Sequence, residues 1–441
     1  MKKKSVILTV ISLLLIFAAA VNLMGCAKEN GKTDVTTENN QTEDTPQDTV
    51  IEIKAENLMD NVTAGKVSAL EDLSAQNAAV TDFALRLFRE SETSGENTLI
   101  SPLSVLCALA MTANGAKEET LSQMEAVLGM SVEELNLYLY SYMKNLPQGN
   151  KYKLSLANSI WFTDDERFKV NQEFLQTNAD YYGADIYKAP FNDQTLKDIN
   201  NWVKQNTDDM IPEILDKISQ DAVMYLVNAL AYEAEWGTPY EEQQVREGEF
   251  TKEDGTKQSA EFMYGSEHIY LEDENATGFM KYYKGGKYAF AAMLPREGVS
   301  VSDYISSLSG EELNALLNSP KHTTVITSLP KFETEYAVEM AELLKSMGMI
   351  DAFDQSKADF EGLGTSGAGN LYISRVIHKT FISVAEMGTK AGAATVVEMA
   401  DGGAMPDEIK EVYLNRPFVY MLIDCENNIP FFIGTMMDVE Q

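Results

Sequence analysis

The segment from Glu386 to Val397, EMGTKAGAATVV, constrains the fold of this chain more than any other. From Thr389 onward, its odd-numbered positions carry small, neutral or β-branched side chains: Thr389, Ala391, Ala393, Thr395 and Val397. The alternate positions carry the charges, first Lys390 and then Glu398. Because side chains of a strand alternate between its two faces, the segment has one uncharged face and is suited to lie within a sheet.

The residues that follow, ADGGAMP at 400–406, predict an exposed loop, because Gly, Asp and Pro are turn-forming residues. A segment suited to a buried strand that leads into an exposed loop suggests two alternative states of the same residues. The simpler alternative is a short edge strand followed by an ordinary surface loop. Taken alone, the segment favours the simpler alternative.

The residues on both sides of this segment resemble the serpin family. HKTFISVAEMGT at 378–389 resembles the strand that leads into the serpin reactive-loop hinge, and NRPFVYMLI at 415–423 with PFFIG at 430–434 resembles the C-terminal signature. Further similar segments are NTLISPLS at 97–104, LVNALAY at 226–232 with Trp236, LPKF at 329–332 and MGMIDAF at 347–353. The resemblance covers residues 75 to 440 in the family's order. It implies an α+β serpin fold, with helices packed on a large central mixed β-sheet, smaller sheets and an exposed reactive loop over residues 386–412.

The apolar pattern along the chain predicts the same fold class. Spacings of three and four residues predict helices at 75–88, 102–115, 117–128, 132–145, 170–182, 195–207, 301–309, 310–318 and 337–347. Alternating or continuous apolar runs predict strands at 154–162, 185–189, 222–232, 262–271, 278–283, 289–294, 323–331 and 371–384. No repeat or internal linker follows residue 75, so residues 74–441 are predicted to form one α+β domain, the serpin domain.

The N-terminus predicts targeting rather than structure. Three lysines at 2–4 precede a short apolar run, Ser5–Val21, and LMGC at 23–26 resembles a bacterial lipobox. We therefore expect a signal peptide at 1–25 and lipidation of Cys26, which would make the protein exported, extracytoplasmic and anchored to the cell membrane. The inner or outer membrane stays open. Residues 26–73 are polar and acidic and predict a disordered tether, with residues 51–73 as a transition that has room for a short ordered stretch.

Charge excludes one class of partner. The chain has 35 Lys and Arg against 68 Asp and Glu, a formal net charge of −33. This argues against nucleic acid and anionic lipid surfaces, which need a basic protein surface, and favours a soluble monomer. Cys107 and Cys425 lie in apolar runs and are predicted to be buried free thiols, although a disulfide between them stays open.

The motifs of common enzymes are missing. The three histidines, His268, His322 and His378, have no second ligand at metal-binding spacing, so no zinc site is expected. GLGTSG at 362–367 satisfies G-x-G-x-x-G but precedes a strand-like run instead of opening a helix, which argues against a dinucleotide site. We predict that the protein is not an enzyme and uses no cofactor; an exported hydrolase is disfavoured because no nucleophile motif occurs.

Four polar residues stand in apolar surroundings: Ser101, Ser104, Asn228 and His378. Burying each alone would be costly, and hydrogen bonds among them would offset that cost. The resemblance places them in the serpin shutter, beneath the central sheet where strands part, and Trp236 in the breach at the top of that sheet. The alternative is a satisfied buried network without a switching role, with Trp236 as an ordinary core residue.

The resemblance implies a suicide-substrate mechanism. A protease attacks the exposed loop and forms an acyl-enzyme, and the cleaved loop enters the central sheet before hydrolysis finishes. A new strand of about ten residues would gain on the order of 10 kcal/mol. Insertion requires small residues and no proline, and none occurs before Pro406. The hinge residues that the family motif places here are Glu386, Gly388, Thr389, Ala391, Ala393, Ala394 and Thr395.

We therefore predict an inhibitor of a serine protease or of a papain-like cysteine protease. A non-inhibitory serpin that acts as a binding or chaperone module is the alternative, which the hinge composition argues against. Lys390 departs from the Glu that is usual in inhibitory relatives, but the alternation places it on the outer face.

The cleaved bond stays open within one short region. The family's common spacing from Glu386 points to Gly402–Gly403, and counting back from Asn415 moves the bond toward Met405. The candidate residues are Met399, Ala400, Gly402, Gly403, Ala404 and Met405. Because no Lys or Arg lies between Lys390 and Lys410, a trypsin-like target is disfavoured, and an elastase-like or subtilisin-like protease is favoured.

Overall fold

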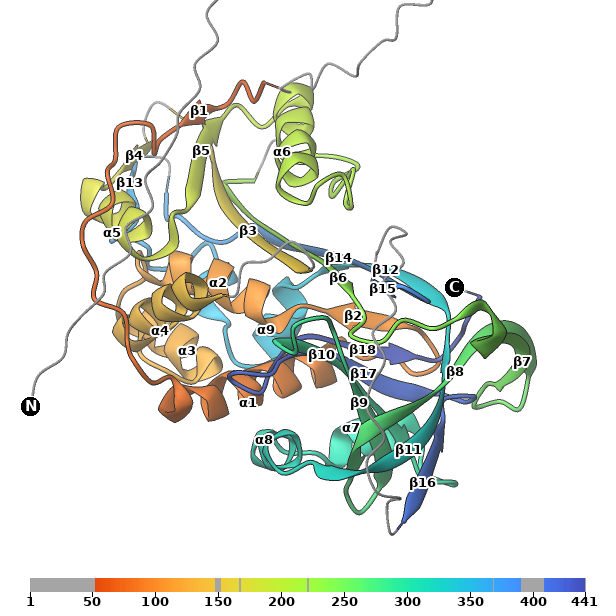
Figure 1. Ribbon diagram of the computed structural model, residues 1–441. Coiled ribbons are helices and arrows are strands. Elements are labelled where there is room, and N and C mark those ends of the chain that lie inside the picture. Colours follow the sequence, from red (N-terminus) through yellow and green to blue (C-terminus); the bar gives the residue numbers. More distant parts are fainter. Residues whose placement is uncertain are drawn as a thin grey trace, which may run out of the picture. The chain divides into compact units, whose positions relative to one another are not determined.

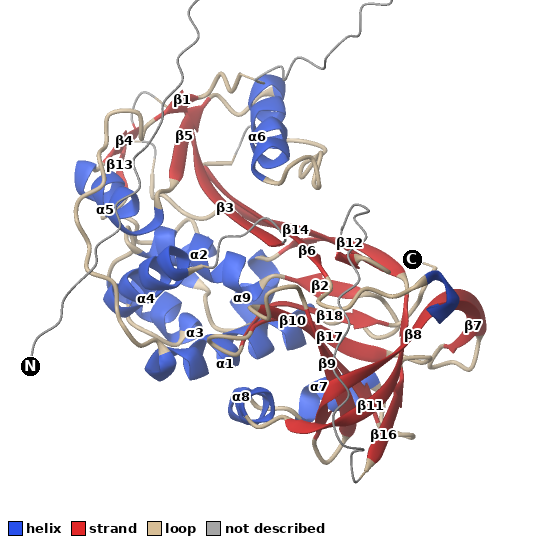
Figure 2. Ribbon diagram, viewed as in Figure 1, coloured by secondary structure: helices blue, strands red, loops and turns tan. Residues whose placement is uncertain are grey.

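The computed structural model describes residues 52–146, 152–165, 168–219, 222–367, 369–389 and 408–440, which belong to one compact unit of residues 51–441. Two large sheets dominate it (Figure 2). One has seven strands in the order β1-β5-β3-β6-β15-β14-β12, and the other has nine, β16-β11-β8-β9-β10-β17-β18-β2 with β7 paired to β8. The predicted α+β class with a large mixed sheet is confirmed.

The helices are α1 (Ser74–Ser91), α2 (Pro102–Ala113), α3 (Glu118–Leu128), α4 (Val132–Asn145), α5 (Gln172–Tyr182), α6 (Asp193–Asn206), α7 (Val301–Ser307), α8 (Gly310–Asn318) and α9 (Ala341–Ser346). The strands are β1 (Glu56–Asn57), β2 (Thr98–Ile100), β3 (Tyr152–Thr163), β4 (Phe168–Val170), β5 (Asp185–Ala189), β6 (Met224–Glu235), β7 (Val245–Thr251), β8 (Lys257–Glu272), β9 (Ala276–Tyr282), β10 (Tyr288–Pro295), β11 (Lys321–Pro330), β12 (Phe332–Glu339), β13 (Gly364–Ser366), β14 (Arg375–Ala385), β15 (Gly388–Thr389), β16 (Ile409–Tyr413), β17 (Phe418–Asp424) and β18 (Ile429–Met436).

Local sequence explains where the best-predicted elements begin. Ser101 and Pro102 start α2, and every residue of this helix is buried, as its unbroken apolar composition requires. Helix α4 begins with a capping box between Ser131 and Glu134. Strand β6 is buried along nearly its whole length, which confirms a strand covered on both faces.

Two predicted elements were wrong in part. The helix expected at 337–347 is shorter, α9, because residues 332–339 form β12 with alternating side chains. The alternation FETEYAVE is a period-two pattern, and β12 pairs with β14 along its length. The strand expected from residue 371 begins at Arg375.

The seven-stranded sheet separates two cores. Helix α6 covers one face through a cluster that includes Trp161, Trp202, Tyr225 and Val227. The opposite face packs on α2 and its neighbours and continues into the second sheet through Ile160, Leu226, Leu230 and Val376, among others. Figure 1 shows α6 and α2 on opposite sides of β3 and β6. Even-numbered residues of β3, β6 and β14 therefore face α2.

Residues 52–73 pack against the domain, in the range where the sequence left room for a short ordered stretch. Strand β1 pairs antiparallel with β5 and adds an edge strand to the sheet. The buried carboxylate of Asp198 accepts hydrogen bonds from the backbone amides of Lys54 and Ala55, at 3.2 and 2.9 Å. Residues 1–51, which include the predicted signal peptide and Cys26, lie outside the described residues. Within the described ranges, no helix is long and apolar enough to cross a membrane.

Candidate functional site: the junction of β6, β15 and β14

Strand β15 consists of only two residues and lies between β6 and β14. Gly388 pairs with Glu235 of β6 and Ala385 of β14, and Thr389 pairs with Ala234 and Val384. Further along, β6 and β14 pair directly with each other, Tyr225–Leu230 against Arg375–Thr380. The same two strands are therefore parted at one end, where the predicted hinge enters, and joined at the other.

Gly388 is required by the close approach of β6. Its φ is +153°, and a Cβ built on it would lie 2.0 Å from the carbonyl oxygen of Ala234. No side chain fits there without moving the strand. The geometry thus requires glycine at this predicted hinge position.

Thr389 points into the buried face. It is 1% exposed, and its hydroxyl lies 2.5 Å from the hydroxyl of Tyr283, whose pKa is raised because the ring is buried. Its partner on β6, Ala234, belongs to the core on the α2 side. This is the face that the uncharged, odd-numbered positions were predicted to occupy.

Residues 236–240, which we call the hinge clasp, bind the backbone of the hinge. The amides of Trp236 and Tyr240 donate to the carbonyls of Met387 and Glu386, at 2.8 and 3.0 Å, and the indole N–H of Trp236 donates to the carbonyl of Ala385 at 2.8 Å. The Trp236 ring stacks on Tyr283 with centroids 4.4 Å apart. Trp236 thus lies at the parted end of the sheet, where the resemblance placed it.

The carboxylate of Glu386 forms an ion pair with Lys331. Lys331, which follows β11, donates to it at 2.8 Å and also to Glu261 at 2.9 Å. The side chains are about one third exposed, so the pair orients the start of the hinge more than it stabilises the fold.

The joined end of β6 and β14 contains a row of polar side chains. Register places Asn158 of β3, Asn228 of β6 and His378 of β14 side by side. Asn228 donates to Asn158 at 2.7 Å, and the Nδ1 atom of His378 lies 2.7 Å from the Asn228 oxygen. Because the Nε2 atom of His378 accepts from the Ser101 amide at 3.0 Å, Nδ1 carries the proton. We call Asn158, Asn228 and His378 the polar row.

Burial sets the protonation state of His378 in this row. His378 is fully buried, and desolvation lowers its pKa to about 3, so the ring is neutral near pH 7. The neutral ring can accept from Ser101 and donate to Asn228 at the same time. A charged ring would break the first of these bonds.

The structure corrects two parts of the predicted cluster. Ser101 takes part through its backbone amide, and the buried hydroxyls of Ser101 and Ser104 have no hydrogen-bond partner in the described structure. Asn158 was not among the predicted site residues, although a polar residue in the apolar strand 154–162 is a signal of the same kind that singled out Asn228.

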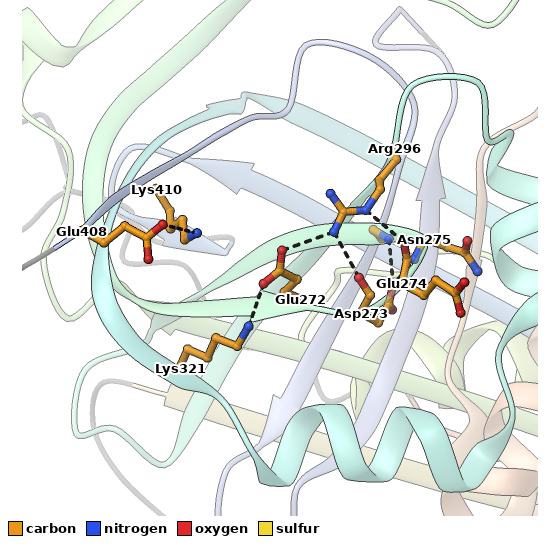
Figure 3. Close-up of polar contacts among 9 residues, drawn as sticks. Glu272, Asp273, Glu274, Asn275, Arg296, Lys321, Glu408 and Lys410 are labelled. Carbon is orange, nitrogen blue, oxygen red and sulfur yellow. Dashed lines mark hydrogen bonds and ion pairs between the residues drawn. The ribbon is translucent and has the colours of Figure 1, made fainter.

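The other end of the reactive loop is anchored on the second sheet. Strand β16 pairs parallel with β11, and the Thr323 hydroxyl donates to the carbonyl of Glu408 at 2.7 Å. Figure 3 shows the surrounding charges: Lys410 bonds to Glu408 at 2.6 Å, and Glu272 binds both Lys321 and Arg296, at 2.6 and 3.2 Å. The described chain thus holds the loop at two separate sheets.

The remaining predicted site residues lie outside the described structure: Ala391, Ala393, Ala394, Thr395, Met399, Ala400, Gly402, Gly403, Ala404 and Met405. Among the residues that are described, no group of three or more His, Cys, Asp or Glu side chains could hold a metal ion. Cys107 and Cys425 are free thiols, the first buried as predicted and the second partly exposed.

Comparisons with known proteins agree with this arrangement. The sequence model of the family described as serpin (serine protease inhibitor) matches residues 78–439. The native state of tengpin, a thermophilic serpin, has a TM-score of 0.83 at 51% identity and covers 87% of this chain and 99% of its own. Its latent state gives 0.75 at 48% identity, with 85% and 100% covered. Leukocyte elastase inhibitor of Equus caballus is 29% identical over 375 residues, 80% of this chain and 96% of its own. The chain belongs to the serpin family.

Proposed function

We propose that this serpin inhibits a protease by inserting its cleaved reactive loop as a full strand between β6 and β14. The observation that carries the proposal is β15: two hinge residues already pair with both strands, while the same strands pair directly with each other further along. The better agreement with native than with latent tengpin supports a loop that has not yet inserted, with TM-scores of 0.83 and 0.75.

The register of β15 supports insertion along the whole hinge. Because β15 is antiparallel to β6 and β14, each further hinge residue would pair one residue earlier on both strands. In this register Thr395 would pair with Asn228 and with His378. A threonine hydroxyl would then lie in the polar row at the place where the bond between Asn228 and His378 has to open. The small odd-numbered residues before it would face the core on the α2 side.

Lys390 also fits this register. It would lie on the opposite face beside Glu233 of β6, whose other neighbour is Lys153 of β3. An opposite charge beside Lys390 would contribute roughly 0.2–1 kcal/mol. In the inserted state, the residue that departs from the family's usual Glu would thus be matched by a carboxylate of this chain.

For the target, we propose an elastase-like or subtilisin-like protease. The support is the small, neutral composition of residues 399–405 and the lack of Lys or Arg between Lys390 and Lys410. A relative named leukocyte elastase inhibitor is in keeping with this class. A papain-like cysteine protease would accept similar residues.

The test mixes the protein with pancreatic elastase, subtilisin, papain and trypsin. We expect a denaturant-resistant covalent adduct with elastase or subtilisin, and none when the protease serine has been blocked beforehand. Protein nicked in the loop should melt well above the intact form, because a new strand joins the sheet. Loop cleavage by the whole panel without an adduct would contradict inhibition and favour a binding role.

We further propose that the protein is exported and anchored through a lipid on Cys26. The support is the sequence alone: the basic start, the apolar run and LMGC at 23–26. In a bacterial host, wild type should take up a labelled fatty acid and partition into detergent. The Cys26→Ala variant should do neither, and equal labelling of both would refute the proposal.

A further inference from the structure

A buried ion pair lies directly beneath the hinge clasp. Lys281 of β9 and Glu267 of β8 are joined at 2.8 Å, and their side chains are only 4% and 13% exposed. A buried lysine is costly unless its charge is paired and its protons are bonded. The other partners of the Lys281 ammonium group therefore show which part of the structure this ion pair positions.

Among the described residues, the other hydrogen-bond and cation–π partners of the ammonium group belong to the hinge clasp. Lys281 Nζ donates to the carbonyl oxygen of Thr238 at 3.0 Å. It also lies 4.3 Å from the ring centroid of Tyr240 and 5.5 Å from that of Trp236, within the range of cation–π attraction. Three of the five clasp residues thus contact one cation.

The same clasp residues hold the hinge on their other side. Trp236 and Tyr240, which flank Thr238, donate their amides to the carbonyls of Met387 and Glu386. Gly388 and Thr389 follow immediately and form β15. The chain of contacts runs from Glu267 through Lys281 to the clasp and from the clasp to the first inserted residues.

We infer that Lys281, neutralised by Glu267, is a positioning residue that keeps the hinge clasp in place, and that it thereby holds β15 between β6 and β14 as the starting point for loop insertion. The effect of this role on inhibition rests on the function proposed above. If the clasp loosens, Gly388 and Thr389 no longer pair with β6 and β14. Insertion then has to begin by ordering these two residues. Slower insertion gives hydrolysis of the acyl-enzyme more time, so more inhibitor is consumed as substrate.

The test replaces both charges with apolar side chains of similar size, Lys281→Met with Glu267→Leu. Such exchanges of buried ion pairs are often neutral or stabilising, so the variant should melt at an unchanged or higher temperature. Hydrogen exchange of the Trp236 and Tyr240 amides should nevertheless become faster, on the order of tenfold, because a charge-assisted bond to the clasp is gone. The stoichiometry of inhibition should rise several-fold, while the initial rate of attack on the loop stays the same.

A matched control is the pair of Lys321 and Glu272 in Figure 3, which joins β11 to β8 without touching the clasp. Lys321→Met with Glu272→Leu should leave exchange in the clasp unchanged. If the first variant does not fold, Lys281→Met with Glu267→Gln keeps one polar group at the site and undergoes the same measurements.

The outcomes separate the hypotheses. Unchanged exchange in the clasp of a folded variant would overturn the role of Lys281, as would faster exchange spread evenly over both sheets. Faster clasp exchange with unchanged stoichiometry would overturn its link to insertion. If wild type forms no adduct with any protease, the proposed inhibition fails, and the exchange measurement, which needs no protease, still decides whether Lys281 holds the clasp.

Discussion

The Nδ1 atom of His378 on β14 donates a 2.7 Å hydrogen bond to the side-chain oxygen of Asn228 on β6. This bond crosses the boundary between the two strands that would have to part for a loop to insert. At the other end of the same boundary, Gly388 and Thr389 are already inserted. In this one structure, β6 and β14 therefore pair directly at one end and are separated by β15 at the other.

Substituting Gly388 should weaken trapping without unfolding the protein. In Gly388→Val, the new side chain would meet the Ala234 carbonyl, since even a Cβ lies only 2.0 Å from it. We expect the ratio of hydrolysed to trapped acyl-enzyme, obtained from the stoichiometry of inhibition, to rise at least about tenfold, the effect of roughly 1.4 kcal/mol on the insertion barrier. Gly369→Ala is the control, because that glycine also has a positive φ, +135°, but nothing lies within 4 Å of its added Cβ. Equal inhibition by wild type and Gly388→Val would contradict the role of β15.

His378 should make stability depend on pH. Its pKa falls from 6.5 to about 3 on folding, so the unfolded state binds one more proton between these values. The contribution of the neutral ring is complete above pH 6.5 and is lost as pH falls toward 3, by about 1.4 kcal/mol per pH unit. In urea unfolding, wild type should exceed His378→Gln in stability at pH 7, and the difference should shrink toward pH 4. His322→Gln, at an exposed position, is the control variant in the same measurements.

Asn158 should matter although sequence reasoning overlooked it. In Asn158→Ala, the Nδ2 donor of the buried Asn228 loses its 2.7 Å partner. We expect the free energy of unfolding to fall by about 1–2 kcal/mol. Ser155→Ala on the same strand, on its other face, serves as the control, measured by the same denaturant titration. A midpoint no lower than that of the control would show that the polar row ends at Asn228.

Reversing Lys390 should affect the cleaved form more than the intact form. If insertion follows the register of β15, Lys390→Glu places two carboxylates side by side, because Glu233 is its neighbour on β6. The nicked variant should melt below nicked wild type, while the intact proteins melt alike. Adding Glu233→Gln, which removes the second carboxylate, should raise the melting temperature of the nicked variant again. No restoration by the second change would mean that the loop inserts in another register.

Much of the fold could be predicted because its signals are local. The caps of α2 and α4, the apolar run of β6 and the alternation around Thr389 depend on residues that are close in sequence. The predicted helix at 337–347 includes the last three residues of β12, because short amphipathic segments permit either period. Only its pairing with β14 decides in favour of the strand.

For the candidate site too, some features follow from the sequence and others only from the tertiary structure. By itself, the sequence determined that small residues without proline follow Glu386, from which it predicts a hinge before an exposed loop, and that Asn228 and His378 need polar partners. The tertiary structure decided which partners these are: Asn158 and the Ser101 amide for the polar row, Tyr283 and Ala234 for the hinge, and Lys281 for the clasp. The physical reason is that side-chain alternation and turn preference act between neighbours in the chain. Hydrogen-bond partners, in contrast, lie from 43 to 277 residues apart in the chain, and the packing of the whole domain sets which of them meet.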